Sequence, residues 1–231
     1  MIRDLVSGGS SSTELIIRFF TRVFVIFCTL PIHEYAHAYV AVKLGDDTPR
    51  LSGRLTLSPL AHIDWIGALM IFIAGFGYAK PVPVNMHNFK TKNQKTGMAL
   101  VALAGPLSNI FMAIFFILIR NVFSLLAVNS HINSLLFTIV YLFFQYAAMI
   151  NISLAVFNFI PIPPLDGSRI ALCIVPNKYY YKIMQYERQI MLVMLALLFF
   201  GVFNAPLQFL SNGLYNVINY LVSSPFPTIP V

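Results

Sequence analysis

The residues with the clearest chemical potential are two histidines and a glutamate inside an apolar stretch, in the order His33-Glu-Tyr-Ala-His37. Residues four apart lie on one face of an α-helix, so both imidazoles can bind one zinc ion while Glu34 reaches a water molecule held beside it. A charged side chain in the middle of a membrane helix costs about 2.5–3.5 kcal/mol, so such residues normally face partners or water. The motif therefore predicts a metal site rather than a solvated helix face.

A zinc enzyme needs a third protein ligand and leaves the fourth position to water. The candidates outside the motif are His62, Asp64, His87, His131, Asp166 and Glu187. Asp166 is the best placed, because it ends the segment Asn158-Phe-Ile-Pro-Ile-Pro-Pro-Leu-Asp166, whose prolines cannot continue a helix. Broken backbone at membrane depth is tolerated where it is buried in protein or lines a water-filled cavity. Taken alone, Asp166 is more simply an N-cap, but beside the histidine motif we expect it to bind the metal.

The composition fixes the class of protein. Of 231 residues, 58% are hydrophobic and only 10% are charged, against about a quarter in a typical soluble domain. The mean hydropathy of +0.77 and the presence of only two cysteines exclude a soluble enzyme, a disordered chain and a disulfide scaffold. The net charge of +7 comes from short basic groups between apolar stretches, which is typical of membrane flanks and does not indicate nucleic-acid binding.

The apolar stretches are the elements that must position the metal ligands. The first runs from Leu15 to Leu44, and a 20-residue window within it covers about 30 Å, the thickness of a hydrocarbon core. The others are Gly97–Ile119, Asn133–Phe159 and a final pair, Gln189–Phe203 and Leu207–Val222. We expect an all-α polytopic membrane protein with about five to six transmembrane helices.

The stretch between the first and second of these helices is expected to associate with the membrane without a full span. Alternation in Arg50–Ser58 predicts a short β-hairpin, and Pro81–Val84 should be extended. Trp65–Ala79 is 15 residues long, which is short for a span and favours a re-entrant or interfacial segment.

The domain organisation follows from these stretches. We predict a flexible leader over residues 1–14, a single membrane-embedded domain over 15–222 with its core at 23–170, and a tail over 223–231.

Two motifs together resemble the site-2 protease family of intramembrane zinc metalloproteases, peptidase M50. The family joins an H-E-x-x-H helix to a later N-x-x-P-x-x-x-L-D-G motif, which here is formed by Asn158, Pro161, Leu165, Asp166 and Gly167. The resemblance runs from about Cys28 to Ile170 and includes Ala104-Gly-Pro-Leu-Ser-Asn109. It is closest to the compact bacterial branch without PDZ or CBS domains.

The resemblance implies His33, His37 and Asp166 as ligands of one zinc ion per chain and Glu34 as the catalytic residue. It implies, more weakly, that Asn158 lines the substrate-binding site. For Asn109 and Asn151 we expect interhelical hydrogen bonds, a common use of buried asparagine in membranes.

The expected function is hydrolysis of peptide bonds in or near the transmembrane helices of single-span membrane proteins, as in regulated intramembrane proteolysis. Two alternatives stay open. One is another H-E-x-x-H membrane protease with Glu187 as third ligand, and the other is a metal carrier without proteolytic activity.

The distribution of basic residues predicts an orientation in the membrane. The Lys80–Lys95 and Pro161–Arg188 loops hold four Lys or Arg each, so both should be cytoplasmic. If Trp65–Ala79 does not span, the N-terminus lies outside and the active site faces the cytoplasmic side of a bacterial plasma membrane. The partners expected are the lipid bilayer and a membrane-protein substrate; the sequence leaves the oligomeric state open.

Overall fold

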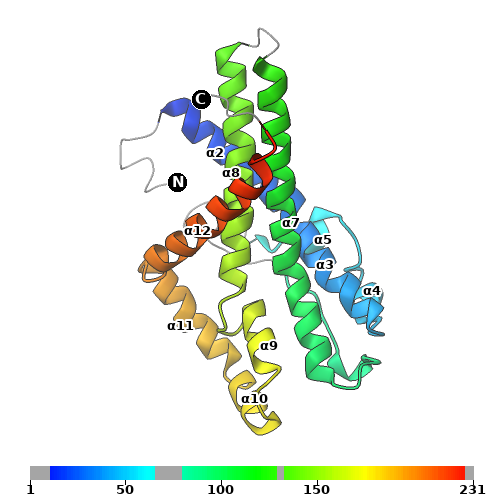
Figure 1. The fold of residues 1–231 in the computed structure, drawn as a ribbon. Coiled ribbons are helices and arrows are strands. Elements are labelled where there is room, and N and C mark those ends of the chain that lie inside the picture. Colours follow the sequence, from blue (N-terminus) through cyan, green and yellow to red (C-terminus); the bar gives the residue numbers. More distant parts are fainter. Residues whose placement is uncertain (1–10, 66–79, 129–132, 227–231) are drawn as a thin grey trace.

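The computed structural model describes residues 11–65, 80–128 and 133–226, and within these ranges the chain is helical and forms no strand (Figure 1). The first membrane helix comprises α2 (Ser12–Phe24), a π-helical turn η1 (Val25–Thr29) and α3 (Leu30–Lys43). The other elements are α4 (Thr48–Leu51), α5 (Pro59–His62), a 3-10 turn η2 (Met86–Asn88), α7 (Gln94–Val128), α8 (Ser134–Asn158), α9 (Asp166–Leu172), α10 (Asn177–Met184), α11 (Glu187–Phe199) and α12 (Asn204–Ser223).

The number of membrane spans is smaller than the sequence suggested. Three helices among the described residues are long and apolar enough to cross a membrane: Ser12–Lys43, Gln94–Ala127 and Ser134–Asn158. The pair α11 and α12 adds a fourth only if it counts as one span, because its two helices meet at an angle of 85°. The prediction of five to six spans is therefore wrong for the described residues, since it counted α11 and α12 as separate spans.

The β-hairpin predicted for Arg50–Ser58 is also wrong. Thr48–Leu51 forms a helical turn instead, with Pro49 at its start and the Asp46 carboxylate accepting from the Thr48 backbone N–H at 3.1 Å. Proline at the first turn and an acidic acceptor before it favour a helix start. The alternating apolar side chains have no core to face, since Leu51 is 85% exposed.

Two neighbouring predictions concern the segment before α7. Residues 81–84 form neither helix nor strand, and their exposed and half-buried side chains alternate; the extended conformation stays a prediction. The re-entrant segment predicted at Trp65–Ala79 lies, except for Trp65, outside the described residues. The leader predicted for residues 1–14 lies partly outside them, and α2 already begins at Ser12.

A π-helical turn precedes the histidine motif in the first membrane helix. Pro31 has no N–H to donate to the carbonyl four residues earlier, so a regular helix would be interrupted here. The helix widens just before it: the Leu30 N–H donates to the Val25 carbonyl, five residues back. The buried hydroxyl of Thr29 donates to the same carbonyl at 3.0 Å. The wide turn accommodates the hydrogen bond that Pro31 cannot donate, and α3 continues into the motif as a regular helix.

The scaffold of the molecule is the pair α7 and α8, which lie side by side in Figure 1 and are crossed by α12. Small residues allow these helices to approach closely: Ala113 on α7 and Ala147 and Ala148 on α8 are fully buried. Phe116, Ile117 and Ile152 complete the shared core, and Ile218 joins it from α12.

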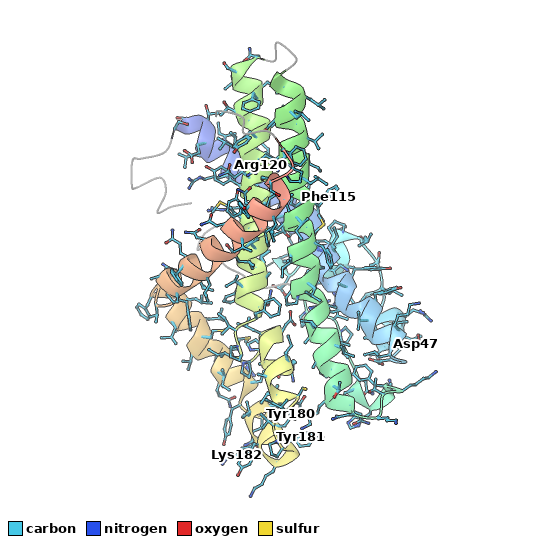
Figure 2. All side chains as sticks on the ribbon, viewed as in Figure 1. Asp47, Phe115, Arg120, Tyr180, Tyr181 and Lys182 are labelled. Carbon is cyan, nitrogen blue, oxygen red and sulfur yellow. The ribbon has the colours of Figure 1, made fainter. Side chains whose placement is uncertain are left out.

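Polar contacts also fix α12 on α7. The buried Arg120 of α7 donates to the Tyr215 hydroxyl at 2.7 Å and to the Asn219 side-chain oxygen at 2.6 Å, at the crossing of the two helices (Figure 2). Its own neighbour Asn121 accepts at 2.9 Å. A buried guanidinium needs hydrogen-bond acceptors, and these side chains provide them.

A second cluster supports the segment that carries Asp166. Leu165, immediately before Asp166, is buried against Met194 and Leu198 of α11. The Arg169 guanidinium of α9 also donates to the Glu187 carboxylate at the start of α11, at 2.6 Å. α11 therefore holds the start of α9 in place through one apolar and one ionic contact.

Candidate metal centre

Three potential ligand atoms from α3 and α9 converge on one point. The Nε2 atoms of His33 and His37 are 3.1 Å apart, and the Asp166 Oδ2 atom lies 3.4 Å from the first and 3.3 Å from the second. Tetrahedral zinc with bonds of about 2.0–2.1 Å holds its donor atoms about 3.3 Å from one another. The spacing of the three atoms therefore matches that of three ligands of one tetrahedral zinc ion.

The chemistry of this donor set also fits a cation. The Oδ2 atom of Asp166 is buried, and no hydrogen bond from a described residue reaches it. A buried carboxylate oxygen without a donor is costly, and a metal ion would satisfy it. Among the described residues, these three form the group of histidine and acidic side chains able to hold a metal.

Asp166 reaches the histidines because the chain turns sharply after α8. The helix α8 ends before Pro161, Pro163 and Pro164, which cannot continue it, and the next helix, α9, begins at Asp166. Gly167 makes this turn possible, because a Cβ atom there would lie 2.3 Å from the Phe159 carbonyl oxygen. The start of α9 is therefore pressed against the end of α8.

α7 supports the histidine motif from behind. The Val101 carbonyl accepts a hydrogen bond from Nδ1 of His37 at 2.7 Å, and Nδ2 of Asn109 lies 3.1 Å from Nδ1 of His33. Gly105 lies midway between them and leaves space for both rings. Because the later histidine contacts the earlier residue of α7, the two helices are antiparallel. Lys43 and Gln94 therefore lie at the same end of the molecule.

Glu34 lies between the two ligands on α3 and is 8% exposed. Among the described residues, no hydrogen bond or ion pair to its carboxylate is formed. A carboxylate in this position can accept a proton from a water molecule at the site.

The other candidate ligands do not join this group. The Glu187 carboxylate is held by Arg169, so the alternative with Glu187 as third ligand is not supported by the described geometry. His62 is fully buried, but its Nε2 contacts the Thr56 carbonyl at 2.8 Å. His87 is exposed, and Asp64 is half-buried outside the group. His131 lies outside the described residues.

Asn158 stands in the last turn of α8, and its amide donates to the Leu154 carbonyl of its own helix at 3.0 Å. It is half-buried. Its role in substrate binding stays a prediction.

The sequence predicts the three candidate ligands but not the groups that support them. Gly105 and Asn109, four residues apart in an apolar helix, are the available signal. The interhelical hydrogen bond predicted for Asn109 is present, but the sequence did not indicate that its partner is His33. The sequence holds no signal for the contact between the Val101 carbonyl and His37, because every residue has a backbone carbonyl.

Comparisons with known proteins agree with the site. Residues 119–201, which include Asp166, match the family model described as peptidase family M50. The chain is 41% identical over 177 residues to the "Putative zinc metalloprotease YwhC" of Bacillus subtilis, with 76% of this chain and 78% of that protein covered. No solved structure matches.

More distant relatives have the same kind of name. The chain is 31% identical over 144 residues to the "Putative zinc metalloprotease Rip2" of Mycobacterium tuberculosis, covering 60% of this chain and 51% of the relative. It is 26% identical over 157 residues to the zinc metalloprotease MJ0392 of Methanocaldococcus jannaschii, covering 68% of this chain and 35% of that protein. Given the identity to YwhC, the apolar helices and the buried ligand group, the chain belongs to peptidase family M50, the site-2 protease family, and is a membrane zinc metalloprotease.

Proposed function

We propose that this protein is an intramembrane endopeptidase that cuts peptide bonds in or near the transmembrane helices of single-span membrane proteins. The observation that carries the proposal is the position of the ligand group within an apolar span. His33 lies ten residues before the end of the Ser12–Lys43 span, about 15 Å along the helix. A peptide bond must come to this depth to be cut, which favours a substrate that is itself in the membrane.

The roles of the residues follow from their atoms. His33, His37 and Asp166 would hold one zinc ion per chain. Bound zinc supplies Lewis acidity, which polarises a water molecule and the scissile carbonyl. Glu34 accepts the proton of the attacking water and passes it to the leaving amine nitrogen as the peptide bond breaks.

Co-expression with candidate single-span proteins tests the proposal, with wild type compared to Glu34→Gln. The variant keeps all three ligands, so it should fold and retain zinc but lose cleavage. Cleavage by Glu34→Gln at a near-normal rate would contradict the proposed role of Glu34. Transport of zinc into liposomes without any cleavage would favour the carrier alternative.

The substrate must be presented to the site with its backbone exposed. The segment from Pro81 to Asn85, predicted to be extended, is suited to pair with it as an added strand, since no backbone hydrogen bond among the described residues engages Val82 or Val84. Val82→Pro removes one of these backbone donors and should lower cleavage while zinc content stays at the wild-type level. Unchanged cleavage would exclude this segment as a pairing edge.

The orientation is part of the proposal, with the N-terminus outside a bacterial plasma membrane and the active site toward the cytoplasm. The antiparallel packing of α3 and α7 supports it, because the basic Lys80–Lys95 loop then lies at the Lys43 end. Cysteines introduced at the exposed Ser12 and Ser52, in a background without Cys28 and Cys173, test it. An impermeant reagent added to cells should label position 12 and spare position 52; the opposite pattern reverses the orientation.

A further inference from the structure

The hydrogen-bond partners of the two Nδ1 atoms differ between His37 and His33, the two proposed zinc ligands on α3. A neutral imidazole that binds zinc through Nε2 carries its proton on Nδ1 and donates it to an acceptor. For His37 this acceptor is present, because the Val101 carbonyl lies 2.7 Å from Nδ1 and a carbonyl can only accept. The Nε2 atom of His37 then carries a lone pair, which faces the ligand group 3.1 Å from Nε2 of His33.

His33 has a different neighbour in the same position. Its Nδ1 contacts Nδ2 of Asn109 at 3.1 Å, and an amide nitrogen donates. With Nδ2 donating to Nδ1, the imidazole proton would sit on Nε2, where it would block a metal. In the same side chain, the Asn109 Oδ1 atom is buried and has no hydrogen-bond partner among the described residues. The Asn109 side chain therefore contains the acceptor that His33 requires, and this Oδ1 atom accepts no hydrogen bond from a described residue.

We propose that Asn109 is a positioning residue for zinc, whose side-chain oxygen accepts the Nδ1–H of His33 when the metal is bound. The two ends of a carboxamide have nearly the same shape, so a half turn of the amide exchanges Oδ1 and Nδ2 with little movement elsewhere. The turn pairs the unused Oδ1 and aims the Nε2 lone pair of His33 at the metal. The proposal rests on the zinc site of the proposed function but is independent of what the enzyme cuts.

The arrangement on α7 explains why one side chain is needed here. Val101, Gly105 and Asn109 are four apart and lie on one helix face, against His37 and His33 on the antiparallel α3. The Val101 carbonyl comes within reach of the His37 ring because Gly105, one turn further along α7, has no side chain over the rings. At Asn109 an acceptor must come from the side chain.

Zinc affinity of the purified full-length protein, measured by competition with a chelating dye, tests this role. Asn109→Leu has a similar size but no acceptor, and should weaken zinc binding about 10–100-fold. Asn109→Asp can only accept, and should bind zinc as tightly as wild type or more tightly. Asn151→Leu is the matched control: Asn151 is also fully buried with an unpaired Oδ1, but its amide donates to the Ala147 carbonyl of its own helix.

Melting of the metal-free variants separates a loss of folding from a loss of zinc. Wild-type zinc affinity in Asn109→Leu overturns the proposal, as does loss of zinc by Asn109→Asp protein that melts at the wild-type temperature without metal. A second measurement needs no variant. In zinc-loaded protein with nitrogen-15 histidine, of which the chain has five, Nδ1 of His33 should carry a proton. An unprotonated Nδ1 overturns the proposal even if every variant fails to fold. Neither readout depends on proteolysis, so a failure here leaves the proposed function standing.

Discussion

A methyl group on the Cα atom of Gly105 would lie 2.3 Å from Nε2 of His37, and 2.6 Å from Cε1 of His33. These distances are far below van der Waals contact, so α7 and the histidine motif can pack together only with glycine at this position. The close approach brings the Val101 carbonyl and the Asn109 amide within reach of the two rings.

Gly105→Ala should therefore displace the imidazoles and weaken zinc binding at least tenfold, with overpacking lowering stability by about 1–3 kcal/mol. Gly213→Ala is the matched control, because a Cβ at that position in α12 meets nothing within 4 Å. It should retain zinc and gain up to about 1 kcal/mol of stability from better helix propensity. Zinc titration and thermal melting of both variants measure these effects. Equal zinc affinity in the two variants would show that Gly105 is not a steric requirement.

Asp166→Asn and Glu187→Gln should separate the two carboxylates considered as third ligand. The first substitution keeps the size of the side chain but removes the charge that binds the cation, so zinc content should fall sharply. Glu187→Gln removes only the ion pair with the partly exposed Arg169, worth about 1 kcal/mol or less, and should keep its zinc. Metal analysis of both purified proteins decides the assignment. Full zinc retention by Asp166→Asn would exclude Asp166 as a ligand.

The candidate ligand group and the long helices could be predicted from the sequence because their signals are local or strongly periodic. His33 and His37 need only helical spacing, and Ser134–Asn158 agrees within one residue with the predicted Asn133–Phe159. The helix predicted at Gly97–Ile119 is longer in the structure, where it runs from Gln94 to Val128. The prediction ended too early because the polar residues Asn121 and Ser124 follow in the sequence. In the structure they are buried on α7: Asn121 contacts Arg120 and Ser223, and the Ser124 hydroxyl donates to the Arg120 carbonyl.

The failures arose where a local capping contact or a tertiary contact outweighed a pattern. Alternation in Arg50–Ser58 predicted a strand, but the Asp46 carboxylate starts a helical turn there. The angle between α11 and α12 depends on how each helix packs: α11 packs through Leu198 in the cluster with Leu165, and α12 packs through Ile218 in the core of α7 and α8. No property of the two sequences taken singly encodes that angle.

Asp46 predicts a pH dependence of stability. Its buried carboxylate accepts from the backbone N–H of Thr48 and of Asn85 and from the Asn88 amide, at 3.1, 2.7 and 2.8 Å. Burial alone would raise the pKa of Asp46, but these hydrogen bonds and that of the Thr48 hydroxyl lower it below its ordinary value of 3.8. A carboxyl with a lowered pKa stabilises the folded state above the unfolded pKa, and the stabilisation is lost as pH falls through the folded pKa.

Near neutral pH, wild type should therefore have a free energy of unfolding about 1–3 kcal/mol larger than that of Asp46→Asn. It should accordingly melt at a higher temperature. The difference should stay constant down to about pH 5 and shrink below about pH 4, as the wild-type carboxylate becomes protonated. Melting both proteins in the same detergent, with chelator present, isolates this group from the zinc site. A difference that grows on acidification would contradict the assignment.

The last prediction concerns how a helix can be cut at all. In an intact helix each interior carbonyl is bonded to an N–H four residues on, and the surrounding turns shield it from attack by water. Under the proposed function, the substrate helix would have to unwind locally before Glu34 could act, and unpaired backbone is costly in a membrane. Glycine or proline near the scissile bond lowers that cost because both disfavour a helix interior, whereas leucine is a good helix former.

Two versions of one single-span substrate make the comparison, one with Gly-Pro and one with a run of Leu at the scissile region. Both are co-expressed with wild type and, as the background control, with Glu34→Gln. We expect faster cleavage of the Gly-Pro version and slow cleavage of the Leu version, because the unwinding cost enters the barrier directly. Substrates matched in expression and membrane insertion that are cut at equal rates would show that unwinding does not limit the reaction.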